Sequence, residues 1–529
     1  MNKLKIFRVV LSVIFFSLIT FFFLDFSNTL SNRFHILAHL QFIPAVILSM
    51  STWVGGAFIS AYVVIMLVLL ALTLLFGRIY CSSLCPMGVF QDIVAWFSKR
   101  FKRKKRYTFS PQKNVLRWTV VVVSAVTFIA GFPLILSLVE PYSAFGRMIA
   151  NVVSPVYIWG NNVLASIFIS FDNYTFIPKK LFIKEISSFI IALLTLVTIG
   201  FLAWKYGRTF CNTVCPTGTI LGFVSRFSRY KIQIDHSKCN HCGLCAMKCK
   251  ASCIDSKNQQ IDDRCVSCFN CLSACNKNAL TYSPTTPNPS KGGELAGASS
   301  SPPLEGLGEV VSRRKFFATS AVVAGATCSA LVAKANPTKG NIPRCTVPIT
   351  PPGSKSARNL RTHCTSCHLC VSKCPSNVLK PAFLEYGLGG MMQPMMTFER
   401  GFCNFNCTTC GEVCPNGAIM GLSKEQKHRT QVGIVRFVEE ICVVHTDATN
   451  CGACAEHCPV QAVRMVPYKN GLTIPKIEPD ICVGCGGCEY ICPVYPRAIF
   501  VEGLAEHREA KPIQKSEKMV LDDEIGFGF

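Results

Sequence analysis

The chain has 529 residues, of which 50% are hydrophobic and 16% charged, and its formal net charge is +24. A mean hydropathy of +0.34 combined with so much positive charge is typical of a membrane protein with basic loops and excludes an ordinary soluble domain. We expect no nucleic-acid partner, because the densest basic run, "SKRFKRKKRY" (98–107), directly follows an apolar segment, as cytoplasmic loops of membrane proteins do.

Four apolar segments predict transmembrane helices, since about 20 apolar residues span a bilayer: residues 6–24, 55–76, 118–139 and 187–206. Lys and Arg cluster at the N-terminus, at 98–107 and at 226–231, and such clusters mark the cytoplasmic side. We interpret 34–50 and 151–170 as interfacial segments on the outer side, because Pro and Asn interrupt the second of them.

A cysteine motif occurs twice, each time directly after an apolar segment. "GRIYCSSLCPMG" (77–88) and "GRTFCNTVCPTG" (207–218) are offset by 130 residues and indicate two repeated hairpins. Their four cysteines would form either a shared metal or cluster site or a redox-active dithiol, and we favour a role in passing electrons: Cys81, Cys85, Cys211 and Cys215. Arg78 and Arg208 either offset negative charge there or anchor the chain at the lipid headgroups.

Two cysteine tetrads follow the fourth segment with the spacing of ferredoxin ligands. In two-cluster ferredoxins the fourth Cys of each motif ligates the other cluster, which predicts one cluster on Cys239, Cys242, Cys245 and Cys275 and a second on Cys265, Cys268, Cys271 and Cys249. The Pro that usually follows the fourth Cys is replaced by Lys250 and Asn276. A zinc site is the alternative, but it needs only one tetrad at looser spacing.

Composition changes at residue 283, where a segment rich in Ser, Pro and Gly predicts a flexible linker (283–311). The next segment, "SRRKFFATSAVVAGATCSALVAKANP" (312–337), has the pattern of a twin-arginine export signal. "AKA" (333–335) fits cleavage after Ala335. A cytoplasmic anchor is the alternative interpretation.

Four more tetrads follow, all ending in Cys-x-x-x-Cys-Pro: Cys364, Cys367, Cys370 and Cys374; Cys403, Cys407, Cys410 and Cys414; Cys442, Cys451, Cys454 and Cys458; Cys482, Cys485, Cys488 and Cys492. The second and third of these four motifs are irregular. The sequence therefore leaves open whether the motifs pair as neighbours or pair first with fourth and second with third. Residues 364–368 also match the haem-attachment motif Cys-x-x-Cys-His. Because Cys370 and Cys374 complete a tetrad with Cys364 and Cys367, we favour an iron–sulfur cluster over haem at this motif. Cys253, Cys328 and Cys345 remain without a predicted role.

The predicted fold is a polytopic α-helical membrane domain, with four helices plus one export or anchor helix, joined to α+β ferredoxin domains of the bacterial two-cluster type. The predicted boundaries are 1–230 for the membrane domain, 231–282 for a two-cluster ferredoxin, 283–311 for the linker, 312–337 for the signal-like segment and 338–529 for a four-cluster ferredoxin. The cofactors expected are six 4Fe–4S clusters, with a further metal at the Cys-x-x-x-Cys-Pro pairs.

The two Cys-x-x-x-Cys-Pro motifs and the tetrads after them resemble the NapH membrane polyferredoxins of quinol dehydrogenases, and more distantly the NosR and CcoG families. The part from 312 onward is similar to the exported NapG ferredoxins, so the chain resembles a fusion of the two. This resemblance implies menaquinol oxidation in the bacterial inner membrane, with electrons passed to a periplasmic reductase or its cytochrome c subunit and with export by the twin-arginine machinery. Candidates for a quinol site on the outer side are His35, His39 and Gln41.

The sequence leaves one conflict and two alternative functions. Charge places 231–282 in the cytoplasm and the signal places 338–529 in the periplasm, so electrons would need a relay through helices that show no haem-binding His pair. The CcoG resemblance suggests an assembly factor for a respiratory complex instead. A cytoplasmic ferredoxin-driven reductase would follow if 312–337 were only an anchor.

Overall fold

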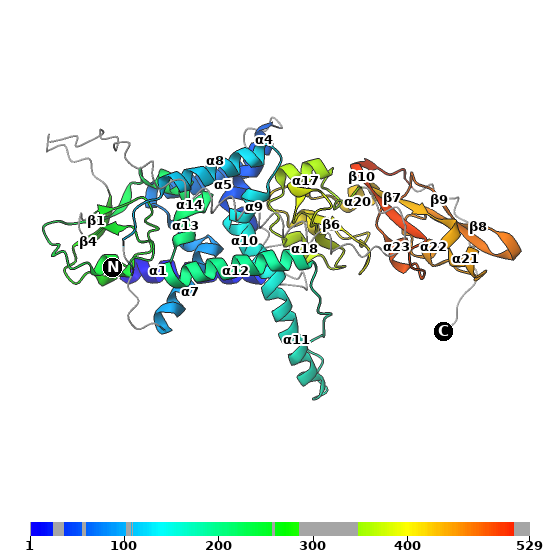
Figure 1. Ribbon diagram of the computed structural model, residues 1–529, viewed down its shortest axis with the longest axis horizontal. Helices are drawn as coiled ribbons and strands as arrows, with labels where there is room; N and C mark the ends of the chain where they lie inside the picture. The colour runs from blue at the N-terminus through cyan, green and yellow to red at the C-terminus, as the bar shows by residue number, and fades with distance from the viewer. Residues whose placement is uncertain are drawn as a thin grey trace, which may run out of the picture. The chain divides into compact units, whose positions relative to one another are not determined.

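The computed structural model describes residues 2–24, 36–54, 60–101, 107, 109–255, 260–284 and 347–512 (Figure 1). The predicted linker (apart from its first two residues), the predicted export segment, His35, Cys328 and Cys345 lie outside the described residues. The described residues belong to one compact unit.

The N-terminal part is helical throughout. Its elements are α1 (Asn2–Leu24), α3 (Ile36–His39), α4 (Phe42–Val54), α5 (Ala61–Phe76), α6 (Ile79–Ser83), α7 (Pro86–Phe101), α8 (Asn114–Ile129), α9 (Leu134–Val139), α10 (Pro141–Met148), the π-helical turn η1 (Ile149–Val153), α11 (Ser154–Ile169), α12 (Ile186–Tyr206), α13 (Thr209–Thr213) and α14 (Pro216–Ser225). Three helical stretches in the described chain are long and apolar enough to cross a membrane: Lys3–Leu24, Pro141–Ile169 and Ile186–Tyr206. Two shorter apolar helices, α5 and α8, match the second and third predicted segments.

The structure corrects two of the predicted segments. The predicted helix 118–139 is interrupted: α8 ends at Ile129, Gly131 has a positive φ of 83°, and α9 starts after Pro133. The predicted interfacial segment 151–170 is part of a continuous helical stretch, Pro141–Ile169, in which the π-helical turn η1 directly precedes α11 and its Pro155.

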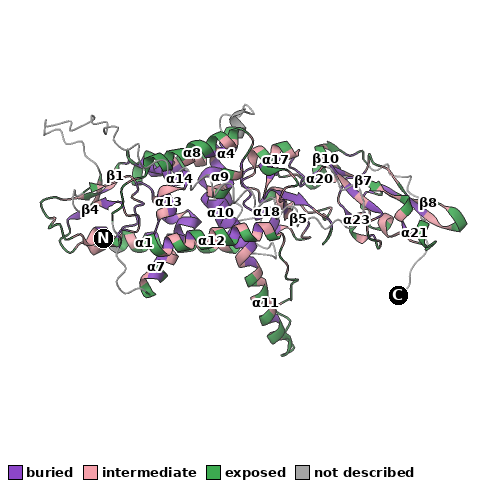
Figure 2. Cartoon of the chain, viewed as in Figure 1, coloured by how far each residue is buried: buried purple, intermediate pink, exposed green. Residues whose placement is uncertain are grey.

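Helix α11 leaves the α1 and α12 pair at a steep angle (Figure 1). Most of its surface is exposed (Figure 2), and the exposed residues include Val156, Trp159 and Ile167. By contrast, the described part of the other predicted interfacial segment is largely buried. Phe42, Ile43 and Ala45 of α4 are each less than 9% exposed, and the helix packs on α5.

Two hairpins repeat the same sequence of elements, α5–α6–α7 and α12–α13–α14. Gly77 and Gly207 end the long helices with φ of 76° and 79°, values that favour glycine. A side chain on Gly88 would place its Cβ 2.2 Å from the carbonyl oxygen of Cys81, and one on Gly218 would place it 2.1 Å from that of Cys211. The Gly of each Cys-Pro-x-Gly motif therefore lets the following helix press directly on the cysteine turn.

The first ferredoxin follows α14. Strands β1 (Tyr230–Ile234) and β4 (Leu280–Pro284) pair antiparallel and enclose a small hairpin of β2 (Ile254–Asp255) and β3 (Gln260–Ile261), with α15 (Leu244–Lys248) and the 3-10 turn η2 (Leu272–Ala274) between them. We call residues 230–284 the inner ferredoxin.

Residues 347–512 form what we call the outer ferredoxin. Its strands form antiparallel pairs, β5 (Leu379–Pro381) with β6 (Pro394–Met396), β7 (Thr430–Phe437) with β10 (Ile499–Glu509), and β8 (Val463–Pro467) with β9 (Thr473–Ile477). Between the strands lie short helical elements: α17 (Ala357–His363), α18 (Leu369–Lys373), η3 (Leu388–Gly390), α19 (Thr409–Glu412), α20 (Lys424–Arg429), η4 (Glu439–Ile441), α21 (Val443–Thr446), α22 (Ala453–Glu456), η5 (Lys469–Gly471) and α23 (Gly487–Ile491). The β7–β10 pair encloses the β8–β9 hairpin as β1–β4 encloses β2–β3.

The two ferredoxins contact opposite ends of α1. Near its N-terminus, Lys5 Nζ donates to Ser273 Oγ of the inner ferredoxin at 3.3 Å. Near its C-terminus, the ring of Phe22 lies 4.8 Å from Lys373 Nζ of the outer ferredoxin. The contacting residues Lys5 and Phe22 are 17 positions apart, which corresponds to about 26 Å along the helix at 1.5 Å per residue, slightly less than the roughly 30 Å of a bilayer's hydrocarbon core.

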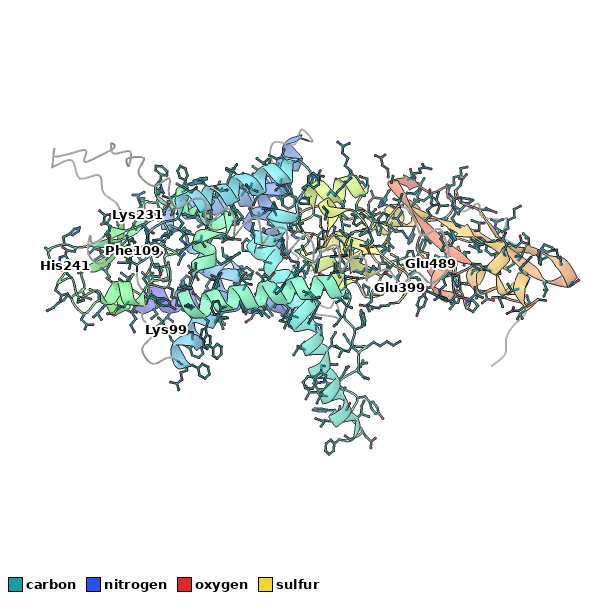
Figure 3. All side chains as sticks on the ribbon, viewed as in Figure 1. Lys99, Phe109, Lys231, His241, Glu399 and Glu489 are labelled. Atoms are coloured by element: carbon teal, nitrogen blue, oxygen red, sulfur yellow. The ribbon has the colours of Figure 1, made fainter. Side chains whose placement is uncertain are left out.

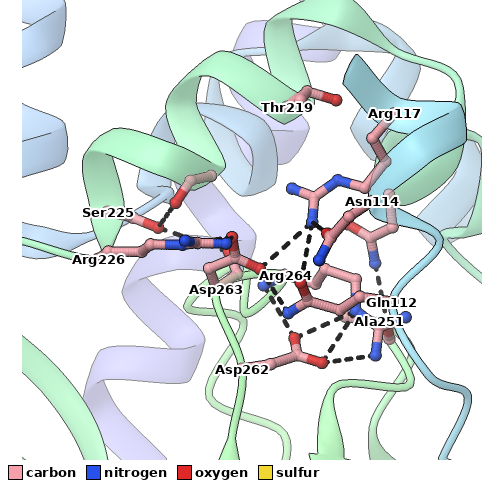
Figure 4. A network of polar contacts seen from close by, with 12 residues as sticks. Gln112, Asn114, Arg117, Thr219, Ser225, Arg226, Ala251, Asp262, Asp263 and Arg264 are labelled. Carbon is pink, nitrogen blue, oxygen red and sulfur yellow. Dashed lines mark hydrogen bonds and ion pairs between the residues drawn. The ribbon is translucent and has the colours of Figure 1, made fainter. Parts of the chain in front are cut away.

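A buried polar network holds the inner ferredoxin on the helices (Figure 4). Asp263 pairs with Arg117 of α8 at 3.3 Å and with Arg226 at 2.8 Å, and it accepts a hydrogen bond from Gln112 at 2.7 Å. The Asp263 and Arg117 side chains are only 4% and 3% exposed. Because such a buried pair is costly to break, the docking geometry is fixed.

Candidate iron–sulfur centres

The regular tetrads share one backbone conformation. In each Cys-x-x-Cys turn the residue before the second Cys is left-handed, at His241, Ser267, Ser366 and Gly484. The residue after that Cys is left-handed as well, at Gly243, Phe269, His368 and Gly486. Left-handed residues on both sides of a Cys turn the backbone N–H groups of the loop toward one side and form concave anion sites of the kind found around iron–sulfur clusters. Accordingly, Ser366 N donates to Cys364 Sγ at 3.4 Å and Gly484 N to Cys482 Sγ at 3.3 Å.

A second conformation recurs after the fourth Cys of five tetrads. The third residue beyond that Cys is left-handed at Ser252, Asn278, Asn377, Gly417 and Gln461. The inner tetrads adopt this turn although Lys250 and Asn276 replace the usual Pro. The missing Pro therefore leaves the turn intact.

In the inner ferredoxin the thiols gather as the sequence predicts. Site I consists of Cys239, Cys242, Cys245 and Cys275, which line one cavity. Site II consists of Cys249, Cys265, Cys268 and Cys271, whose thiols interact electrostatically with one another. Figure 3 labels His241, which belongs to the first turn of site I.

Cys253, to which the sequence assigned no role, lies against site II. Its Sγ is 3.4 Å from Cys249 Sγ, and it also contacts Cys265. The residue is 1% exposed, so a fifth thiol is buried between two predicted ligands of this site.

In the outer ferredoxin neighbouring motifs pair, which resolves the alternative left open by the sequence. The thiol of Cys414 interacts with those of the first motif, and the thiol of Cys374 with those of the second. These contacts define site III as Cys364, Cys367, Cys370 and Cys414, and site IV as Cys374, Cys403, Cys407 and Cys410.

The third and fourth motifs exchange their last cysteines in the same way. Cys458 interacts with the fourth motif and Cys492 with the third. Site V is therefore Cys458, Cys482, Cys485 and Cys488, and site VI is Cys442, Cys451, Cys454 and Cys492, whose thiols line one cavity. The loop 443–450 bridges the long gap that made this motif irregular.

The sites follow one another in a fixed order. Site I meets site II through Cys245 and Cys271. In the outer ferredoxin, site III shares its motifs with site IV, and Cys403 N of site IV donates to Cys485 O of site V at 2.9 Å. Site V meets site VI through Cys488 and Cys454. Each ferredoxin thus arranges its sites as a series.

His368 is not available as a haem ligand. Its Nε2 donates to Met392 O at 2.9 Å, and its Nδ1 accepts from Asn151 Nδ2 at 3.0 Å. Burial lowers the pKa of His368 to about 3, so the ring is neutral. The side chain joins the outer ferredoxin to η1, in agreement with the cluster interpretation of this motif.

The four cysteines of the repeated hairpins come together in one buried group, which we call the membrane centre: Cys81, Cys85, Cys211 and Cys215. Each is 3–4% exposed, and every pair of the four thiols interacts electrostatically. Gln91 Nε2 donates to Cys211 Sγ at 3.1 Å. The two hairpins therefore bring their four cysteines together, as a site shared between them requires.

Arg78 and Arg208 are completely buried beside the membrane centre, which contradicts the alternative that they anchor the chain at the lipid headgroups. Arg208 Nε pairs with Asp92 at 2.8 Å, and Asp92 also contacts Arg8 at 2.5 Å and Lys250 at 3.4 Å. Sequence reasoning missed Asp92, although an acidic residue between apolar segments is a functional signal in a membrane protein.

The predicted quinol-site residues that the structure describes, His39 and Gln41, do not line the cavity that reaches the outer ferredoxin. Gln41 is 1% exposed and accepts from Tyr80 Oη at 2.9 Å, and the His39 ring lies 5.3 Å from that of Tyr62. The cavity, of about 640 Å³, lies instead between η1, α11, the loop 179–184 and the outer ferredoxin, where it reaches Cys374 of site IV.

The donor sets fit iron–sulfur clusters, which are held by four thiolates. Among the described residues no three His, Cys, Asp or Glu side chains converge closely enough for a single metal ion.

Comparison with known proteins supports this assignment. A family model described as a 4Fe-4S binding domain matches residues 58–105 and 187–235, the two repeated hairpins, and a 4Fe-4S dicluster domain matches 449–495. No solved structure matches the chain.

Three relatives are ferredoxin-type proteins. The methylamine utilization ferredoxin-type protein MauM of Methylobacillus flagellatus is 30% identical over 30% of this chain and 69% of its own length. The ferredoxin-type proteins NapF and NapG of Escherichia coli are 29% and 27% identical, over 30% of this chain and over 87% and 72% of their own lengths. The chain therefore belongs to the family of Nap- and Mau-type ferredoxin proteins, as an iron–sulfur electron-transfer protein of the Nap-type polyferredoxin class.

Proposed function

We propose that the protein oxidises menaquinol in the bacterial inner membrane and passes the electrons through the outer ferredoxin to a periplasmic reductase or its cytochrome c subunit, in nitrate respiration or a related process. In this proposal residues 338–529 reach the periplasm through the twin-arginine machinery, and the inner ferredoxin stays in the cytoplasm. The names of the Nap relatives and the contacts of the two ferredoxins with opposite ends of α1 support it.

One observation carries the proposal, the cavity at the foot of α11. Its volume of about 640 Å³ suits a small-molecule ligand. Pro155, Ile158 and Phe182 supply an apolar wall, and α11 beside it presents exposed apolar side chains to lipid. A lipid-soluble substrate therefore has an apolar approach to a cavity that ends at Cys374 of site IV.

The polar lining fits the chemistry of a quinol. Oxidation to quinone releases two electrons and two protons, so a proton acceptor is needed near the hydroxyl groups. Glu399 lines the cavity (labelled in Figure 3), and Asn151 and Arg400 add a hydrogen-bonding amide and a positive charge. Site IV would hold a cluster that supplies one-electron chemistry, and Glu399 would accept the two protons in turn and release them toward the outer solvent.

The test is anaerobic reduction of the clusters by a menaquinol analogue in membranes that contain the full chain, followed by EPR spectroscopy. We expect rapid reduction in the wild type and at least a tenfold slower reduction in Glu399→Gln. Glu440→Gln is the matched control, since Glu440 is an exposed carboxylate outside the cavity.

Reduction by dithionite but not by the quinol analogue would contradict quinol oxidation and favour the assembly-factor alternative. Equal rates in the two variants would move the quinol site away from this cavity, back to the region of His39 and Gln41.

A further inference from the structure

We propose that Cys81, Cys85, Cys211 and Cys215 together hold a seventh iron–sulfur cluster, and that this membrane centre passes single electrons between site II of the inner ferredoxin and site III of the outer ferredoxin. It goes beyond the proposed function, because it concerns transfer across the membrane and needs no quinol.

The first argument is the arrangement of thiols. Both pairs lie at equivalent places, with the second Cys directly before the Pro that opens α7 or α14. All four are buried, and each thiol interacts with the other three. Four convergent thiols from two segments are the ligand set of an iron–sulfur cluster. None of the described cysteines forms a disulfide bond.

The second argument is charge. Arg78 is 0% exposed and has no carboxylate within ion-pair distance in the part of the chain that the structure describes. Its Nη2 lies 3.9 Å from Cys81 Sγ and 3.5 Å from Cys211 O, while Nη1 donates to Asn212 Oδ1 at 3.3 Å. An uncompensated buried charge costs several kcal/mol. Thiolates that ligate a cluster supply the missing negative charge at the place where this guanidinium points.

The third argument is contact with site II. Arg78 interacts electrostatically with Cys265 as well as with Cys81, and Arg208 with both Cys268 and Cys211. Asn212 Nδ2 donates to Ala251 O at 2.9 Å, and Arg208 N donates to Lys250 O at 3.0 Å. The segment after Cys249 therefore lies directly on the second cysteine turn of the membrane centre.

The fourth argument is a buried connection to site III. Glu140 is 1% exposed and interacts electrostatically with Cys85 on one side and with Cys367 on the other. Tyr80 lies beside Cys85, and Tyr142 lies beside Cys367. Helix α10 touches site III directly: a Cβ on Gly146 would lie 2.5 Å from Cys367 O, and Arg147 Nη1 donates to Ser366 O at 3.2 Å.

The transfer is a sequence of one-electron steps. A reduced cluster at site II loses one electron and is oxidised, the membrane centre gains it, and site III then gains it as the membrane centre returns to its oxidised state. A cytoplasmic low-potential one-electron donor would reduce the inner ferredoxin. A dithiol–disulfide pair is less suited to this position, because it exchanges two electrons at once, whereas the sites on both sides exchange one.

The first test is the iron and acid-labile sulfide content of the purified full chain. Cys81→Ser/Cys211→Ser is compared with Ser82→Ala, which alters a buried neighbour on the same short helix without removing a thiol. We expect the cysteine variant to lose about two or about four iron atoms per chain, according to whether the cluster is 2Fe–2S or 4Fe–4S. The EPR signals of the six ferredoxin sites should stay unchanged.

The second test measures transfer across the membrane. In inverted vesicles, where the cytoplasmic face is outside, membrane-impermeant dithionite is added and reduction of the outer-ferredoxin sites is followed by EPR. We expect those sites to be reduced in the wild type and in Ser82→Ala. In the cysteine variant they should stay oxidised while sites I and II are reduced.

Three results would overturn the proposal: unchanged iron in the cysteine variant, zinc bound at the four cysteines in place of iron, or outer sites reduced equally fast without these thiols. If the double variant does not accumulate, Arg78→Gln with all four thiols kept replaces it, with the same two readouts. A failure of quinol oxidation would leave both readouts unaffected, since dithionite is the reductant.

Discussion

The two repeated hairpins differ at one position that decides how each arginine is neutralised. Arg208 of the second hairpin pairs with Asp92 of the first at 2.8 Å. The repeat places Gly222 where Asp92 stands in the first hairpin, and a Cβ on Gly222 would lie 3.6 Å from Arg78 Nη1. Among the described residues, one arginine therefore pairs with a carboxylate, whereas the other contacts a thiol and two amide oxygens. The repeat preserves the thiols and varies the charge around them, which leaves the membrane centre electrostatically asymmetric.

The largest effect is expected from Asp92→Asn. This change leaves Arg8, Arg208 and Lys250 buried around an uncharged amide. Removing one partner of a buried ion pair costs about 3–5 kcal/mol, so we expect most of the folded protein to be lost. Asp255→Asn on the inner ferredoxin is the control, and the amount of folded chain in detergent is the measurement. Normal accumulation of Asp92→Asn would show that groups other than Asp92 balance the charges of these three side chains.

Arg78→Gln should act on the membrane centre and much less on folding. The side chain loses a charge that contacts a thiol and two amide oxygens and no carboxylate of the described chain, so the unfolding temperature should fall less than in Asp92→Asn. We expect loss of the iron assigned to the membrane centre and a block of transfer from site II to site III. Arg78→Lys keeps the charge and should retain part of the iron. Full iron in Arg78→Gln would contradict the charge argument.

Gly222→Asp makes the second hairpin resemble the first. The new carboxylate lies near Arg78 and Arg117, and the closest atom to the new Cβ is Arg117 Nη2 at 2.9 Å. Added negative charge favours the oxidised cluster, so its reduction potential should fall by on the order of 60 mV, a tenfold change in the one-electron equilibrium. Gly222→Asn is the control of equal size. A redox titration in which both variants shift equally would assign the effect to volume.

The smallest effect is expected from Asn212→Ser, which places the residue of the first hairpin, Ser82, in the second. Asn212 links Arg78 to Ala251 O through two hydrogen bonds of 3.3 and 2.9 Å. Losing one such bond costs about 1 kcal/mol, so iron content should stay constant and the unfolding temperature should fall by a few degrees. Loss of iron in this variant would show that Asn212 positions the cluster and does more than stabilise docking.

Local patterns predicted the cluster turns well, because each depends on residues close together in sequence. The exchange of Cys249 and Cys275 followed from the ligand pattern of two-cluster ferredoxins, and the structure groups the thiols in the same way. The pairing of the outer motifs did not follow, since the loop between Cys442 and Cys451 can carry its thiol to more than one partner.

The surroundings of the membrane centre were harder to predict because its contacts join distant parts of the chain. Asp92 is 84 residues from Arg8 and 116 from Arg208, and nothing in its own helix marks it as buried. The role of Glu140 likewise depends on its interactions with Cys85 and Cys367, which belong to different domains. The continuous helix through 151–170 was not expected, because Pro155 was interpreted as an interruption, whereas the structure places a π-helical turn directly before α11 and continues the helix past this residue.

Arg78 and Arg208 each donate a hydrogen bond to the other hairpin, and this reciprocity bears on the evolutionary origin of the chain. Arg78 Nη2 donates to Cys211 O at 3.5 Å, and Arg208 Nη1 donates to Cys81 O at 2.8 Å. Each hairpin thus completes the cysteine turn of the other, and neither is sufficient by itself. Such mutual contacts are those of an isologous two-fold interface. An ancestor with a single hairpin would have needed to dimerise, and gene duplication with fusion would have freed its two halves to diverge, as Asp92 and Gly222 have done.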